Sequence, residues 1–108
     1  MKKIAVALIG LFASLTLAAG NPDFARPRTT LKKAVATYDS AIAAPGDNGA
    51  SLVRSLLEIA GATSAIDSDS LPTVMPRIRQ AAEACSDGAT KAMVLLVEAD
   101  VLNVIYTS

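Results

Sequence analysis

The chain has 108 residues, with ten Lys and Arg against ten Asp and Glu, and 52% of its residues are hydrophobic. Zero net charge without a basic run argues against a nucleic-acid binder, which needs clustered Lys and Arg. The sequence has no His and only one Cys, Cys85, so the usual His/Cys zinc sites and His-dependent catalytic groups cannot be assembled. We therefore expect no catalytic residues, no metal ligands and no small-molecule cofactor.

Residues 1–20 have the three parts of a secretory signal peptide. Lys2 and Lys3 give a positive end, an apolar stretch follows, and small residues at 18–20 suit cleavage. The apolar stretch is shorter than the about 20 residues needed to cross a bilayer, although an uncleaved membrane anchor stays open as an alternative. We expect export to the periplasm or cell envelope of a bacterium, membrane contact only through this leader, and a mature chain starting near Asn21.

The mature chain is predicted to be an extended arm followed by one helical module. Pro22 and Pro27 disfavour helix, so residues 21–28 are expected to be extended. Over 29–108, apolar residues recur at three- and four-residue spacing, which is typical of amphipathic helices. The expected helices cover about 29–44, 50–61, 70–85 and 89–106.

The segments between these helices carry turn and capping signals. The Pro- and Gly-containing segment 45–49 is expected to stop the first helix, and 62–69 is expected to be a loop. Ser70 is expected to cap the third helix, with Pro72 in its first turn. Short links imply antiparallel neighbours, so the predicted fold is all-α, with two helical hairpins that resemble a repeat only weakly.

The fourth predicted helix is the most apolar of the four, and for that reason we expect it to lie at the centre of the module. The chain stops at Ser108, directly after this helix and without a polar tail. Domain ends are usually looser and more polar. This ending predicts that residues 1–108 begin a longer protein.

Two carboxylates near the third helix have the spacing that opens a calcium loop. These are Asp67 and Asp69. An EF-hand loop also needs Gly at its sixth position and Glu at its twelfth, where this chain has Pro72 and Ile78. Helix capping by Asp69 and Ser70 is therefore the preferred interpretation.

Glu98 and Asp100 are the acidic residues of the fourth helix. Two residues apart on a helix, their side chains point in different directions and cannot form an acid/base pair. We expect one to face solvent and the other to pair with an arginine such as Arg77 or Arg79.

The remaining candidates have simple structural interpretations. Cys85 is expected to be a buried thiol, and pairing with another chain or with a later cysteine stays open. The one basic cluster is expected to be a solvated arm, in preference to a membrane or nucleic-acid contact. It consists of Arg26, Arg28, Lys32 and Lys33.

Several short motifs resemble the start of very large exported bacterial α2-macroglobulin-like proteins. They are the proline-flanked opening Pro22–Pro27, the Asp-Ser-Leu-Pro turn Asp69–Pro72, the Leu-Leu-Val-Glu-Ala helix segment Leu95–Ala99 and the pair Ile105–Tyr106. The resemblance covers about residues 22–108. It implies a helical N-terminal segment ahead of a series of β-sandwich macroglobulin domains.

Members of that family bind and trap proteases, in some cases through a thioester motif. The segment Cys85–Ala89 does not match that motif, so the resemblance places any trapping activity outside these residues. It implies a non-catalytic module whose partners are downstream domains of the same chain or another envelope protein. The alternative is a stand-alone periplasmic adaptor that binds a protein or peptide in a groove between its helical hairpins.

Overall fold

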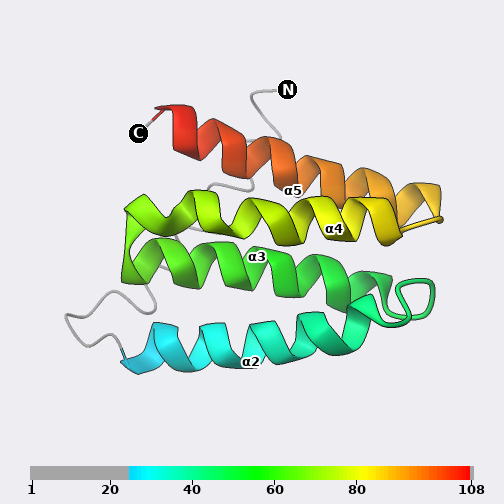
Figure 1. The fold of residues 1–108 in the computed structure, drawn as a ribbon, viewed down its shortest axis with the longest axis horizontal. Helices are drawn as coiled ribbons and strands as arrows, with labels where there is room; N and C mark the ends of the chain where they lie inside the picture. Colours follow the sequence, from blue (N-terminus) through cyan, green and yellow to red (C-terminus); the bar gives the residue numbers. More distant parts are fainter. Residues whose placement is uncertain (1–24, 108) are drawn as a thin grey trace.

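The computed structural model describes residues 25–107, which form four α-helices and one 3-10 helix (Figure 1). Successive α-helices run in alternate directions, and the described residues contain no strand. The all-α fold with antiparallel helices is confirmed. The elements are α2 (Ala25–Ile42), α3 (Gly49–Ile66), η1 (Ser68–Val74), α4 (Met75–Ala84) and α5 (Gly88–Thr107).

Helix α2 begins earlier than expected. Residues 25–28, predicted to be part of an extended arm, are helical. Pro27 is the third residue of the helix, where a backbone N–H would have no partner within the helix, so its missing donor costs nothing. Its ring is buried. Residues 21–24 and the predicted leader 1–20 lie outside the described residues.

Helix α3 is longer than expected, because 62–66 continue it instead of forming a loop. Gly61 and Ala62 are both buried in this last part of the helix. Burial of these two positions outweighs the weak helix propensity of glycine. The helix ends at Asp67, whose backbone is extended.

The predicted third helix is two elements, η1 and α4. Asp67 caps η1: its carboxylate accepts from the backbone N–H of Asp69 at 3.1 Å and from the Ser70 hydroxyl at 2.9 Å. The capping residue is therefore Asp67, and the expected cap at Ser70 is wrong. Pro72 lies inside η1, where the tighter 3-10 winding accommodates it.

Helix α3 is the centre of the packing, and the expected central place of the most apolar helix is wrong. Helix α3 packs against α2, η1, α4 and α5, while α5 packs against α3, α4 and η1. In Figure 1, α5 lies at one edge of the module and α2 at the other. The larger side chains of the core that are buried almost completely are Tyr38, Leu52, Leu56, Ile59, Ile78, Val94, Val97 and Val101.

One tyrosine of α2 forms hydrogen bonds with α4. Tyr38 of α2 is 2% exposed, and its hydroxyl donates toward the Arg77 carbonyl oxygen (2.9 Å) and the Gln80 Oε1 atom (2.6 Å), both in α4. This link fixes α4 relative to α2 across the face of α3. Among the described helices, none combines the length and apolar character needed to span a bilayer.

Candidate functional site: a groove between α2, α3 and η1

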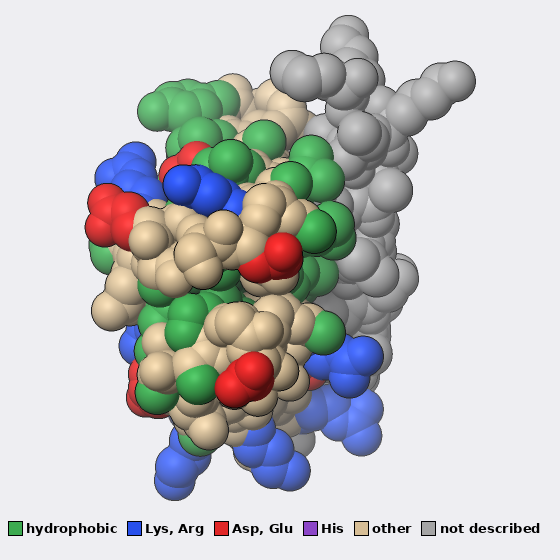
Figure 2. Space-filling model, turned by 90° about the vertical axis from the view of Figure 1, so that its right-hand side faces the viewer, with side chains coloured by type: hydrophobic (Ala, Val, Ile, Leu, Met, Phe, Trp, Pro, Cys, Tyr) green, Lys and Arg blue, Asp and Glu red, His purple; other side chains and the backbone are tan. Residues whose placement is uncertain are grey.

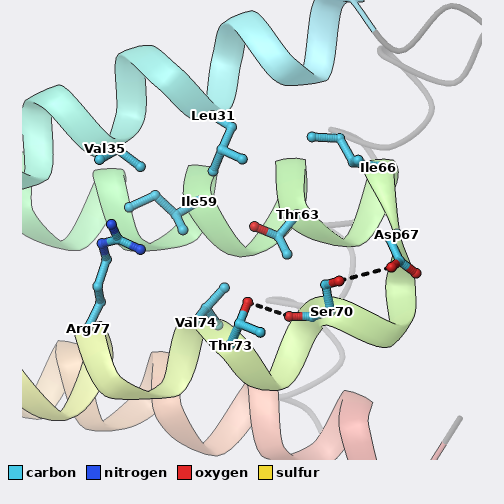
Figure 3. A pocket seen from close by; sticks show the side chains of 10 residues that line it. All are labelled: Leu31, Val35, Ile59, Thr63, Ile66, Asp67, Ser70, Thr73, Val74 and Arg77. Atoms are coloured by element: carbon cyan, nitrogen blue, oxygen red, sulfur yellow. Dashed lines mark hydrogen bonds between the residues drawn. The ribbon is translucent and has the colours of Figure 1, made fainter.

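A groove of about 380 Å³ lies between the first hairpin and the segment that follows it (Figure 3). Helix α2 forms one wall, α3 the floor, and η1 with the start of α4 the other wall. Its volume is within the range of ligand pockets, roughly 300–1,000 Å³. The lining residues are Leu31, Val35, Ile59, Thr63, Ile66, Asp67, Ser70, Thr73, Val74 and Arg77.

The groove exists because the chain turns sharply after α3. Asp67 ends α3 and starts η1, which carries the chain back along α3 at a distance from α2. Leu31 and Val35 are four residues apart on one face of α2, so both point toward the space left above α3 (Figure 3). The two walls and the floor therefore come from separate elements held by the common core.

The middle of the groove is apolar, and two of its three hydroxyl side chains are already engaged. The Thr73 hydroxyl donates to the Ser70 carbonyl oxygen at 2.6 Å, and the Ser70 hydroxyl donates to Asp67. Leu31 and Val35 are only half-buried, although they pack against the core. The groove thus offers mainly apolar contact surface, in which the Thr63 hydroxyl has no hydrogen-bond partner and the Arg77 guanidinium no ion pair among the described residues.

The two ends of the groove carry opposite charges. Asp67 lies at one end and Arg77 at the other (Figure 3). The Arg77 guanidinium lies 5.9 Å from the centre of the Tyr38 ring, a cation–π distance, and it is not in an ion pair with any of the residues described. Burial raises the pKa of the Tyr38 hydroxyl, against the opposing effect of the nearby Arg77 charge, so the ring stays neutral.

Asp100 is the most unusual titratable group outside the groove. It lies on α5 beside the buried Val101, is 1% exposed, and neither carboxylate oxygen has a hydrogen-bond partner. Burial raises its pKa to about 6. The expectation that the acidic residues of this helix divide between solvent and an arginine is half right. Glu98 pairs with Arg79 at 3.7 Å, but Asp100 is buried because it borders the apolar face of the helix.

The other sequence candidates do not form a site. Asp67 and Asp69 serve the turn into η1, and among residues 25–107 no three acidic or Cys side chains come together as possible metal ligands. Cys85 is 6% exposed, which confirms the expected buried thiol. Asp67 is the one acidic side chain that lines the groove, and Cys85 does not line it.

The basic cluster is exposed, as expected, although it lies on a helix rather than on an arm. Figure 2 shows Lys and Arg side chains along the lower edge of the molecule, where α2 lies, and mixed charges elsewhere on that face. The cluster residues of α2 are Arg26, Arg28, Lys32 and Lys33, all exposed. They do not line the groove.

A second, more open hollow of about 330 Å³ lies on the other side of α2, toward the start of α3. Its lining is small and largely polar, and includes Ala36, Thr37 and Ser40. It lacks the large apolar side chains of the groove. We therefore take the groove as the candidate site and the hollow as a comparison surface on the same helix.

No protein-family model, curated protein or solved structure matches the chain. The resemblance to α2-macroglobulin-like proteins therefore stays a prediction based on short motifs. In the structure, one of these motifs, Asp69–Pro72, is part of η1, and Leu95–Ala99 is an ordinary stretch of α5.

Proposed function

We propose that this protein is a non-catalytic helical module that binds a segment of a protein partner in the groove between α2, α3 and η1. The observation that carries the proposal is the groove itself: half-buried Leu31 and Val35 face Ile59 and Val74 across an open space that is mainly apolar. Covering such surface is favourable by roughly 25 cal/mol per Å² of apolar area removed from water.

The groove favours a helical ligand over an extended one. The described walls and floor are helices, whose backbone groups bond within each helix. An extended peptide placed there would leave its own N–H and C=O groups without partners, which is costly in an apolar environment. An amphipathic helix satisfies its backbone internally and can insert apolar side chains at i, i+3 or i+4, and i+7.

The resemblance to α2-macroglobulin-like proteins supplies one candidate for the partner, namely a downstream domain of the same polypeptide. The other candidate is a separate envelope protein, as in the adaptor hypothesis. Both use the groove in the same way. Reading the coding sequence past the codon for Ser108 distinguishes them.

The test compares two substitutions on α2 in the purified 108-residue chain. Leu31→Glu places a charge in the groove, and Ala36→Glu places the same charge in the hollow on the other side of the helix. The probe is a fluorescein-labelled amphipathic helical peptide of about eighteen residues with Leu at i, i+4 and i+7. We expect Leu31→Glu to weaken binding at least about tenfold and Ala36→Glu to leave it unchanged, because a carboxylate buried without a partner costs more than 1.4 kcal/mol.

Fluorescence anisotropy measures both affinities, and circular dichroism confirms that each variant is folded. The proposal is wrong if the peptide does not bind the unmodified protein, or if both variants bind it as well as the parent does.

A further inference from the structure

The two charged residues at the ends of the groove differ in their availability to a ligand. Both oxygens of Asp67 accept hydrogen bonds from η1, so this carboxylate is committed to the turn. Arg77 has no carboxylate partner among the described residues, and its side chain lines the groove (Figure 3). Its guanidinium lies 5.9 Å from the centre of the Tyr38 ring. One end of the groove therefore presents a cation that a ligand can pair with.

The position of Arg77 is fixed before any ligand binds. Its own carbonyl oxygen accepts from the Tyr38 hydroxyl, and its guanidinium faces the ring of the same tyrosine. Tyr38 is almost fully buried and is held also by Gln80. The hydrogen bond anchors the backbone of Arg77, and the ring contact restricts its side chain, which reduces the conformational freedom lost when the guanidinium forms a further contact.

A purely apolar ligand is a poor match for this end of the groove. Covering the half-buried Arg77 would remove water from a charged guanidinium. A carboxylate on the ligand replaces that water with a charge-assisted, two-pronged hydrogen bond. At the opposite end, the negative charge of Asp67 disfavours a second carboxylate.

We propose that the groove selects an amphipathic helix that carries an acidic side chain at the end of its apolar stripe, with that side chain bound by Arg77. The inference rests on the proposed function, and it adds the charge and the direction of the ligand. An acidic residue at one end of the stripe fixes which way the bound helix runs between Arg77 and Asp67.

The test uses the amphipathic peptide described above, with Leu at i, i+4 and i+7, which we call the Leu-stripe peptide. Glu, Gln or Lys is placed one turn beyond these leucines. In one series this residue lies at the N-terminal end of the stripe, and in a second series it lies at the C-terminal end. On the unmodified chain we expect the Glu peptide of one series to bind about fivefold more tightly than its Gln counterpart, and the Lys peptide to bind most weakly. Raising the ionic strength to about 0.5 M should reduce the difference.

Two variants assign this preference to one residue. Arg77→Gln should abolish the difference between Glu and Gln peptides, whereas Arg79→Gln should keep it, because Arg79 lies on the same helix but is outside the groove and pairs with Glu98. In Arg77→Glu, the preference should reverse toward the Lys peptide. This reversal is a positive signal that a merely damaged fold could not give.

The possible failures are distinguishable. Equal affinities of the Glu, Gln and Lys peptides for the unmodified chain would overturn the role of Arg77, while leaving a groove that binds apolar helices. A preference that persists in Arg77→Gln would assign the selectivity to another residue and also overturn it. Absence of binding by every peptide would overturn the proposed function itself.

Discussion

The contact between the starts of α3 and α5 makes a quantitative test of the packing. A Cβ atom added to Gly49 would lie 2.6 Å from Thr90 Oγ1 and 3.1 Å from Thr90 Cγ2. Rotation of Thr90 cannot relieve both contacts cheaply, since its hydroxyl donates to Asp87 Oδ2 at 2.8 Å and β-branched side chains have few rotamers. Overpacking of this kind costs about 1–3 kcal/mol, against a gain below about 1 kcal/mol from replacing Gly by Ala in a helix. We therefore expect Gly49→Ala to lower the free energy of unfolding by about 1–2 kcal/mol.

The same substitution should be harmless when Thr90 is shortened. In Thr90→Ala, only the Cβ atom remains, at 3.5 Å, which is an ordinary contact. Gly49→Ala in that background should be neutral or stabilising, which gives a coupling energy of about 1–3 kcal/mol between the two sites. Gly88→Ala is the matched control, because Gly88 also begins a helix and has open space around it. Urea unfolding followed by far-UV circular dichroism measures all four variants. Additive effects of Gly49→Ala and Thr90→Ala would refute the close approach of α3 and α5.

Two further predictions concern buried polar groups. Because burial raises the pKa of Asp100 to about 6 from its ordinary 3.8, its charged form destabilises the folded state. This effect is absent below pH about 4, grows as pH rises toward the folded-state pKa, and is complete above it. Asp100→Asn should therefore raise the free energy of unfolding by about 2–3 kcal/mol at pH 7.5 and change it little at pH 4. Urea unfolding at both pH values measures this difference. Equal effects at the two pH values would contradict the burial of Asp100. Tyr38→Phe removes the hydroxyl that bonds to α4 and leaves a part-buried carbonyl oxygen with one partner fewer, so it should cost about 1–2 kcal/mol in thermal and urea unfolding. A loss below about 0.3 kcal/mol would count against the link.

The sequence alone was sufficient to predict the fourth helix, which is a long apolar run. The turn before α5 and nearly the whole length of that helix follow from Asp87, Gly88 and the apolar run after them. The Asp87 carboxylate accepts from the Thr90 N–H, and its pKa is lowered by this hydrogen bond and by that from the Thr90 hydroxyl. Such local signals are readable because both partners lie within one turn.

The predicted helix boundaries differ from the observed ones where tertiary packing decides the local structure. The continuation of α3 through Gly61 and Ala62 depends on their burial, which single-sequence periodicity does not report. The division of the third predicted helix into η1 and α4 depends on the cap at Asp67. Aspartate is a capping residue type, and the sequence alone does not choose between Asp67 and Asp69.

The groove was anticipated only in general terms, as a binding surface between hairpins. Its lining comes from positions 31 to 77, so no local pattern could identify the particular residues. Arg77 was considered only as a partner for acidic residues of the fourth helix. Its place beside Tyr38 depends on how α4 is placed relative to α2, which is a property of the assembled fold.

Titration of the ¹⁵N-labelled chain with the Leu-stripe peptide, followed by the amide resonances of the protein, shows whether the groove is the binding surface. We expect the largest shifts on groove residues such as Val35, Ile59 and Thr63, and we expect these shifts to disappear in Leu31→Glu. The competing apolar surface is the outer face of α5, where Leu95 is 45% and Tyr106 83% exposed. Shifts that cluster around these two residues and leave the groove unchanged would contradict the account.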